Sequence, residues 1–130
     1  TQYQAGDKNW SLAQDASGIV YVGNDLGLLE YDGDQWQRYP LPNQRPVRAV
    51  LAANERIFIG SYEEFGFWQR DPYGQLQYHS LTPLLRDFNF HNDEIWKILR
   101  VGETVYFQSF GTVFRYDGKA VEVIVPPSPL

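Results

Sequence analysis

The stretch Asp15-Ala-Ser-Gly-Ile-Val-Tyr-Val-Gly23, continued by Gly27-Leu-Leu-Glu-Tyr-Asp-Gly33, indicates how this chain folds. Asp15 and Gly18 are turn residues, because an aspartate side chain accepts backbone hydrogen bonds and glycine tolerates a positive φ. Residues 19–22 are continuously apolar and are β-branched or aromatic, which predicts a strand covered on both faces. The stretch therefore predicts a turn followed by a buried strand.

Three more strands are predicted around this buried strand. Residues 10–14 precede it, residues 28–31 follow it, and Asp32-Gly33 predicts a two-residue hairpin turn. Residues 36–39 come next and are the most polar, as suits the outer edge of a sheet. The four segments predict one antiparallel sheet in chain order.

The same order of turns and strands returns twice along the chain. Three pairs of positions, each 13 residues apart, mark the predicted equivalent points: Trp10 and Gly23, Val47 and Gly60, and Ile95 and Gln108. The copies start 37 and then 48 residues apart, and the 11 extra residues fall in residues 81–92, where Thr82 and Pro83 predict a capped helical turn with Thr82 as N-cap. A repeat of about 40 residues with four strands is typical of a β-propeller blade.

The predicted fold is all-β, with three four-stranded antiparallel β-propeller blades in one domain spanning residues 1–130. The blades are expected at about residues 9–43, 46–81 and 93–125, with a short helical turn in the insertion 81–92. Residues 93–100 alone have a helical apolar pattern, but the repeat favours a strand at 95–99. Residues 1–8 are expected to be a lead-in segment, and Pro126-Pro-Ser-Pro129 a linker.

Three blades are fewer than the four to eight that close a propeller, so the apolar faces of the outer blades would be open. We therefore expect an N-terminal piece of a larger propeller, partnered by further blades of a parent chain or by a second copy in a homodimer. The absence of methionine also favours a piece of a longer protein.

Composition excludes several classes of partner. A net charge of −5, from 16 acidic and 11 basic residues, argues against nucleic acid and against contact with anionic membrane surfaces. The chain has no cysteine, so disulfides and thiolate metal sites are excluded. No apolar run approaches the length of a membrane helix.

The pattern Asp15-x-x-Gly18-x-x-Tyr21-x-Gly23-x-x-x-Gly27-Leu28, followed by Tyr31-Asp-Gly33, resembles the two-component regulator propeller repeats. These repeats form the large extracytoplasmic sensor regions of bacterial hybrid histidine kinases and related transcription regulators. The resemblance implies a periplasmic ligand sensor, often for glycans, that is joined through a membrane helix to a kinase or regulator. Gln108 replaces the glycine of this pattern in the third copy, which we interpret as ordinary divergence.

Propeller ligands usually meet the loops that enter the first strand of each blade and those between its second and third strands. In this chain the rule selects, beside Asn9, the following candidate binding residues: Asn24, Asp25, Arg45, Ser61, Tyr62, Glu63, Asp93, Glu94, Ser109 and Phe110. Tyr62 and Phe110 could stack on a sugar ring of an oligosaccharide or small-molecule ligand, while Asp25 and Glu63 could accept its hydroxyls. The alternative is that these loops are solvated and that their aromatic residues pack on adjacent blades.

No catalytic, metal or cofactor site is predicted. Glu63 and Glu64 could suggest a glycosidase pair, but adjacent residues point apart and we interpret them as exposed loop charges. His79 and His91 lack further ligands at a suitable spacing. The tryptophans are expected to pack between blades rather than to bind ligand: Trp10, Trp36, Trp68 and Trp96. The leading hypothesis is a binding module of a sensor, and the alternatives are a fragment of a propeller glycosidase or lyase and a structural array for protein interaction.

Overall fold

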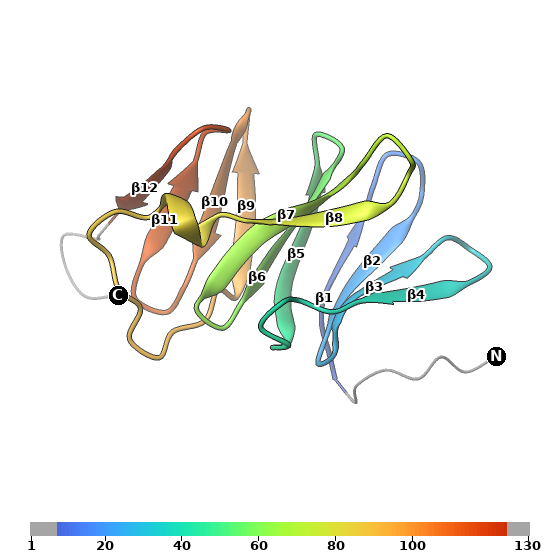
Figure 1. Ribbon diagram of the computed structural model, residues 1–130, viewed down its shortest axis with the longest axis horizontal. Helices are drawn as coiled ribbons and strands as arrows, with labels where there is room; N and C mark the ends of the chain where they lie inside the picture. Colours follow the sequence, from blue (N-terminus) through green and yellow to red (C-terminus); the bar gives the residue numbers. More distant parts are fainter. Residues whose placement is uncertain (1–7, 125–130) are drawn as a thin grey trace.

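The computed structural model describes residues 8–124 as three separate four-stranded sheets that follow one another along the chain (Figure 1). All three sheets are antiparallel, and their strands pair in chain order. The predicted all-β fold of three propeller blades is therefore confirmed as a partial propeller. Residues 1–7 of the predicted lead-in and the predicted linker at 126–129 lie outside the described residues.

The strands of the three blades have the following bounds. Blade 1 contains β1 (Asn9–Gln14), β2 (Val20–Asn24), β3 (Gly27–Tyr31) and β4 (Trp36–Tyr39). Blade 2 contains β5 (Val47–Ala53), β6 (Arg56–Ser61), β7 (Glu64–Arg70) and β8 (Leu76–Ser80). Blade 3 contains β9 (Lys97–Val101), β10 (Thr104–Gln108), β11 (Val113–Tyr116) and β12 (Val121–Ile124).

Aspartate side chains build the turns between strands. Asp15 Oδ1 accepts hydrogen bonds from the backbone N–H groups of Ser17 and Ile19, both at 3.0 Å, as the sequence predicts. The turn after β3 differs from prediction, because Tyr31 pairs with Trp36 and four residues lie between them. Asp32 Oδ1 accepts two backbone N–H groups within this loop, so the two-residue hairpin prediction is wrong.

In the first strand of each blade, the observed strand pairing differs from the alignment that the 13-residue spacing predicts. The pairs across the first two strands of each blade are Ser11 with Gly23, Ala49 with Gly60, and Lys97 with Gln108. The residues just before these partners are Trp10, Arg48 and Trp96. The first two occupy register shifts, and Trp96 donates its backbone N–H to Gln108 O at 3.0 Å.

The predicted equivalence of Trp10 with Val47 and Ile95 is therefore wrong by one position. The equal 13-residue spacing concealed a difference in turn length between the blades. Five residues lie between the last paired residues of β1 and β2, whereas two lie between those of β5 and β6. The strand predicted at 95–99 is confirmed in type but begins at Lys97. Ile95 precedes it, and its backbone N–H donates to Ser61 O of blade 2 at 3.0 Å.

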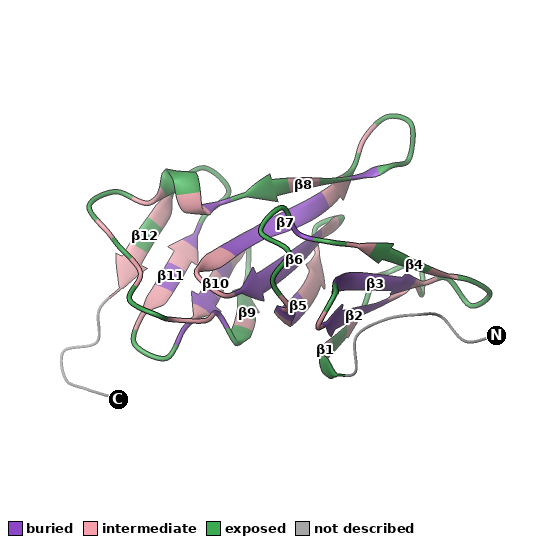
Figure 2. Ribbon diagram, turned by 60° about the horizontal axis from the view of Figure 1, so that its bottom comes forward, coloured by how far each residue is buried: buried purple, intermediate pink, exposed green. Residues whose placement is uncertain are grey.

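Blade 2 lies between the other two blades, and the core consists of its two contacts with them (Figure 2). Tyr21 and Leu28 of blade 1 pack against Ile59 and Trp68 of blade 2. On the other side, a cluster rich in phenylalanine joins blades 2 and 3: Phe58, Phe65, Phe67, Phe107 and Phe114. The apolar second strands that the sequence predicts to be buried owe their burial to this stacking.

The insertion between blades 2 and 3 covers their common core. Its only regular element is a 3-10 turn, η1 (Thr82–Leu84). Leu81 rather than Thr82 holds the N-cap position, so the predicted cap is wrong, and the Thr82 hydroxyl instead donates to Glu64 Oε1 at 3.1 Å. Farther along, the rings of Phe88 and Phe90 contact Phe114 at centroid distances of 5.1 and 5.6 Å.

Glycine is required where one blade meets the first strand of the next. A Cβ atom at Gly23 would lie 2.6 Å from the carbonyl oxygen of Val47, and one at Gly60 would lie 2.8 Å from that of Ile95. Gln108 holds the same position in blade 3, opposite the first strand of its sheet. Gln108 thus carries a side chain at the position where the first two blades have the glycine that admits the next strand.

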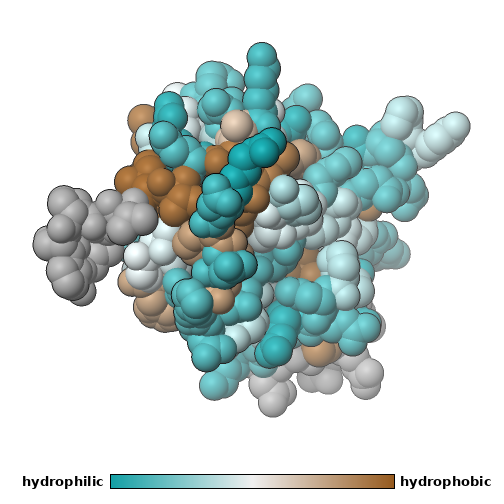
Figure 3. Space-filling model, turned by 60° about the vertical axis from the view of Figure 1, so that its left-hand side comes forward, coloured by the Kyte–Doolittle hydropathy of each residue, from teal (hydrophilic) through white to brown (hydrophobic). Residues whose placement is uncertain are grey.

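The end blades expose apolar side chains, as predicted for an open propeller. Leu12 of blade 1 is 71% exposed, and Leu99 and Val101 of blade 3 are 55% and 57% exposed. Figure 3 shows an apolar patch surrounded by hydrophilic side chains at the blade 3 end of the molecule. On blade 1, however, Val22 and Leu29 are buried. Among residues 8–124, no helix is long and apolar enough to span a membrane.

Candidate ligand-binding site

The predicted binding residues lie at one end of the blades, at the entry to each first strand and at the loops after each second strand. We call this the entry end. Three of them, Asn24, Ser61 and Ser109, are buried and hold the loops together. Ser61 Oγ donates to Pro46 O at 2.7 Å, and Ser109 Oγ donates to Thr112 O at 3.1 Å. Asn24 donates to Asn9 Oδ1 at 2.8 Å, so these three side chains position the loops from inside.

Other predicted residues hold the loops of blades 2 and 3 in place. The Tyr62 hydroxyl donates to Asn92 Oδ1 at 2.7 Å, and Glu63 Oε2 accepts the Asn92 backbone N–H at 2.7 Å. Asp93 Oδ1 accepts the backbone N–H groups of Glu94 and Phe110. Of the two carboxylates predicted to accept sugar hydroxyls, Glu63 is thus partly occupied by a protein donor.

The bulged residues of the first strands connect all three blades at this end. The guanidinium of Arg48 lies over the Trp10 ring, 3.8 Å from its centroid. Arg48 Nε is 2.8 Å from Glu94 Oε2, and the Trp10 indole N–H donates to Asp25 Oδ1 at 2.9 Å. Blade 1 is thus linked through Arg48 to the segment that leads into blade 3.

Aromatic surface remains accessible beside this network. Trp10 and Trp96 are 42% and 43% exposed, and Phe110 is 69% exposed. The rings of Trp96 and Phe110 stack at a centroid distance of 6.1 Å and an interplanar angle of 22°. Arg45 lies over the Tyr62 ring at 4.7 Å. The entry end therefore combines flat apolar rings with fixed carboxylates and guanidinium groups.

Sequence reasoning missed Arg48 and assigned the tryptophans to inter-blade packing. That prediction is confirmed for Trp68, which is buried between blades 1 and 2. The ring of Trp96 instead contacts Phe110, in a loop of the same blade. Trp10, Arg48 and Trp96 share one position of the repeat, directly before the residue that pairs with Gly23, Gly60 or Gln108. The unequal turn lengths hid this common position in the sequence.

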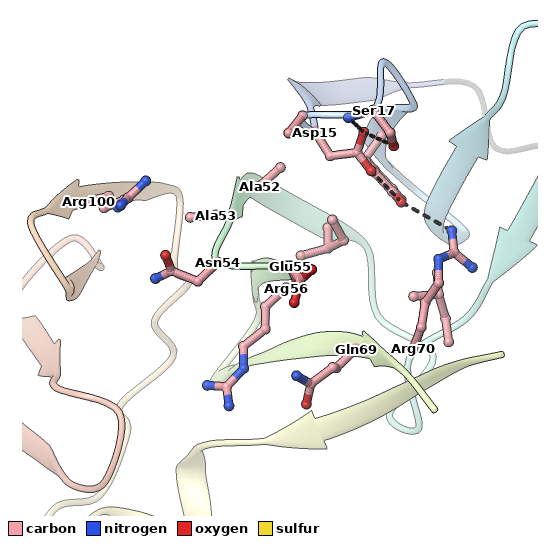
Figure 4. A pocket seen from close by; sticks show the side chains of 14 residues that line it. Asp15, Ser17, Ala52, Ala53, Asn54, Glu55, Arg56, Gln69, Arg70 and Arg100 are labelled. Carbon is pink, nitrogen blue, oxygen red and sulfur yellow. Dashed lines mark hydrogen bonds between the residues drawn. The ribbon is translucent and has the colours of Figure 1, made fainter. Parts of the chain in front are cut away.

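A cavity of about 540 Å³ opens at the opposite end of the blades, which we call the turn end (Figure 4). Arg70 lines this cavity, and its Nη2 forms an ion pair with Glu30 Oε2 across the contact of blades 1 and 2. The Tyr21 hydroxyl accepts from Arg70 Nη2 at 3.4 Å. Burial is the main cause that raises the pKa of Tyr21, and the negative charge of Glu30 adds to it.

Neither end has the geometry of a metal site within residues 8–124, where no three His, Asp or Glu side chains are grouped to hold an ion. The adjacent carboxylates at the start of β7 have separate partners. Glu63 accepts from Asn92, whereas Glu64 Oε2 accepts the Tyr78 hydroxyl at 2.5 Å. Burial is the main cause that raises the pKa of Tyr78, and the Glu64 carboxylate adds to it.

The three stacked sheets define the chain as a segment of a β-propeller with an aromatic and charged entry end. Two solved structures of the extracellular domain of BT4673 from B. thetaiotaomicron share this fold, one described as a proposed one-component system and the other as a proposed hybrid two-component system. Each matches with a TM-score of 0.70 and 16% sequence identity, over 97% of this chain and 16% of the other.

The present chain thus spans only 16% of the length of these structures, and the likeness shows the shared fold. No family model matches the chain, and no curated protein matches it.

Proposed function

We propose that this chain is the first part of an extracytoplasmic, periplasmic sensor propeller of a bacterial two-component signalling protein. In this proposal it binds an oligosaccharide or a related small molecule at the entry end and carries out no catalysis. The fold likeness to the BT4673 extracellular domain supports the sensor assignment. The observation that carries the ligand class is the exposed stack of Trp96 and Phe110 beside Arg48 and Glu94.

Sugar rings suit this surface for physical reasons. The faces of a pyranose ring carry C–H groups that pack on aromatic rings, while the hydroxyls at its edge exchange hydrogen bonds with charged side chains. Asp25 and Glu94 are held in place by Trp10 and Arg48, so their remaining oxygens are already oriented for a ligand. Pre-organised polar groups around an apolar platform are typical of binding sites.

Isothermal titration calorimetry tests this proposal. Linear hexasaccharides of glucose, galactose, xylose and mannose would be titrated into the full chain, and we expect at least one of them to bind. Trp96→Ala and Phe110→Ala should each weaken that binding about tenfold or more, which corresponds to about 1.4 kcal/mol. Tyr73→Ala is the matched control, since Tyr73 is an exposed aromatic residue in the β7–β8 turn at the other end.

Three outcomes would contradict the proposal. Equal binding by the Trp96→Ala and wild-type chains would exclude the aromatic stack as the site. Failure of all four probes to bind at millimolar concentration would exclude neutral oligosaccharides as the ligand class. Shortening of a bound hexasaccharide, detected by chromatography, would instead favour the alternative of a propeller glycosidase or lyase.

A second candidate function is a structural array for protein interaction, favoured by the open apolar surface of blade 3. Leu99 and Val101 hold the positions at which Leu51 and Ala53 of blade 2 pack on the next blade. In this alternative a further blade or a second copy covers the same face. Sedimentation velocity at several concentrations would test it, and a stable monomer would exclude a homodimer through this face.

A further inference from the structure

The turn-end cavity is separate from the entry end and collects residues from all three blades. Its polar wall includes Asn54, Arg56 and Gln69 of blade 2 and Arg100 of blade 3. An adjoining hollow of about 270 Å³ shares Asn54, Arg56 and Gln69 with it. Arg56 therefore lines both hollows. Cavities of this size, about 300–1,000 Å³, commonly hold small molecules.

Arg56 is held in a fixed orientation without a carboxylate partner. Its guanidinium lies over the Phe67 ring, 4.2 Å from the centroid, and Nη1 donates to the Tyr116 hydroxyl at 3.4 Å. No described carboxylate forms an ion pair with it, although other arginines of the chain, such as Arg48 and Arg70, have such partners. A stacked guanidinium keeps most of its N–H groups available at its edge, in a geometry that matches a carboxylate.

Two further groups at the cavity could complete such a site. Gln69 is the cross-strand partner of Arg56, and Figure 4 shows the two side chains extending side by side. The Gln69 amide makes no hydrogen bond to any described residue. Arg100 Nε donates to Gly102 O at 2.8 Å, and this second guanidinium also has no carboxylate partner in the described part of the chain.

The remaining charges at the wall are mostly neutralised. Arg70 is paired with Glu30, and the Asp15 carboxylate accepts hydrogen bonds from its own turn. Backbone and hydroxyl donors, of which the Ser17 side chain is the largest contributor, hold the pKa of Asp15 below its usual value against the opposing effect of burial. Glu55 is left as one unpaired carboxylate of the cavity wall against two unpaired arginines, and the adjoining hollow adds Glu103 and Asp117.

The apolar part of the wall comes from small and aliphatic residues. Ala52, Ala53, Ile57 and Leu76 line the same cavity. The site therefore offers an apolar surface next to two cations and an amide. We propose that the turn-end cavity binds a small organic anion whose carboxylate pairs with Arg56 and Gln69 and whose body lies against these aliphatic side chains. This site is independent of the proposed oligosaccharide site at the entry end.

A matched pair of probes tests the proposal. Glucuronate and glucose share a ring and differ at one carbon by a carboxylate, so they would be titrated separately into the full chain labelled with ¹⁵N. We expect glucuronate to shift the amide signals of residues 52–57 and 69, with an affinity that falls as salt rises. Glucose should leave those signals unchanged.

Two variants assign the binding to the arginines. Arg56→Gln should weaken glucuronate binding at least tenfold, and Arg100→Gln should weaken it severalfold. Because Arg100 is exposed and its side chain packs in neither core cluster, its variant keeps the test valid even if Arg56→Gln disturbs the fold. Glu55→Gln is the control that removes charge of the opposite sign, and it should leave the affinity unchanged or raise it.

Equal shifts with glucose and glucuronate would overturn the proposal, as would glucuronate binding that neither arginine variant weakens. Shifts confined to residues near Trp96 would place the probe at the entry end and would also overturn it. Failure of glucuronate to bind contradicts this site alone, because the proposed entry-end site is tested with neutral sugars and with Trp96→Ala.

Discussion

The guanidinium of Arg48 contacts both the ring of Trp10 and the carboxylate of Glu94. It lies 3.8 Å from the Trp10 centroid, and its Nε lies 2.8 Å from Glu94 Oε2. Because Trp10 belongs to blade 1, Arg48 to blade 2 and Glu94 to the segment that enters blade 3, one side chain couples all three sheets. The entry end is thus stabilised by contacts between blades as well as by its own loops.

The loss of this coupling should be measurable in the stability of the chain. Arg48→Ala is expected to lower the free energy of unfolding by about 1–2 kcal/mol, because it removes a partly buried cation–π contact and an ion pair. Urea denaturation followed by tryptophan fluorescence measures this change. Arg38→Ala is the control, since Arg38 is an exposed residue of β4, and a change within about 0.5 kcal/mol is expected. Equal effects of the two substitutions would contradict the coupling.

The ion pair between blades 1 and 2 should contribute more to the free energy of unfolding than the ion pair on the surface of blade 3. The Glu30 side chain is only 10% exposed and Arg70 is 39% exposed, whereas Arg115 and Glu122 are 41% and 65% exposed. Glu30→Gln should therefore destabilise by about 1–3 kcal/mol, since it leaves a partly buried guanidinium without its counter-charge. Glu122→Gln should change stability by less than about 0.5 kcal/mol. The reverse order in urea denaturation would refute this ranking.

Glycine at the contact between blades 2 and 3 should resist substitution. A Cβ atom at Gly60 would lie 2.4 Å from Ile95 Cγ2 and 2.8 Å from its carbonyl oxygen. Gly60→Ala should lower the free energy of unfolding by about 1–3 kcal/mol, because the two sheets must separate to admit the methyl group. At Gly111 the nearest atom is Asp93 Oδ2, 3.9 Å away, so Gly111→Ala is the matched control. Thermal unfolding curves that coincide for the two variants would show that the blades tolerate wider spacing.

The aspartate turns predict a loss of stability in acid. Asp32, Asp71 and Asp117 each accept backbone N–H groups, and these hydrogen bonds lower the pKa of each carboxyl in the folded chain below its ordinary value of 3.8. The unfolded chain therefore binds protons first as the pH falls. Stability from these turns is complete above the unfolded pKa and is lost as the pH falls below it through the folded values.

The test compares unfolding midpoints of the wild-type chain and a triple variant with asparagine at these three turns, between pH 6 and pH 3. Asparagine keeps a side-chain oxygen as acceptor but does not titrate, so the midpoint of the variant should fall less steeply below about pH 4. Parallel curves for the two chains would show that other carboxylates govern the acid sensitivity.

The blade architecture was predictable from sequence because it rests on local patterns that repeat. The apolar second strands and an aspartate turn before the fourth strand recur in all three copies, and β4 begins and ends where predicted. Register was less predictable, because blade 2 has a first turn shorter by three residues but one more residue in each of the two paired strands, and together these shift Arg48 against Trp10 by one position. Such a shift changes which side chain faces a neighbouring blade.

The candidate sites were only partly predictable for a related reason. The order of the strands alone was enough to place the entry-end loops, and it predicted that residues such as Asp25 and Phe110 lie at the same end of the sheets. The burial of Asn24 and Ser61 depends on hydrogen bonds with segments distant in the sequence, which no local pattern indicates. The turn-end cavity combines side chains of three blades, so Arg56 and Arg100 had no sequence signal in common.

Gln108 sets a limit on the symmetry of any larger assembly. A backbone carbonyl of the following blade approaches Gly23, and another approaches Gly60, at places that a Cβ atom could not share. The third equivalent position carries the side chain of Gln108. A sheet packed beyond blade 3 with the same close approach would require that side chain to turn away from it.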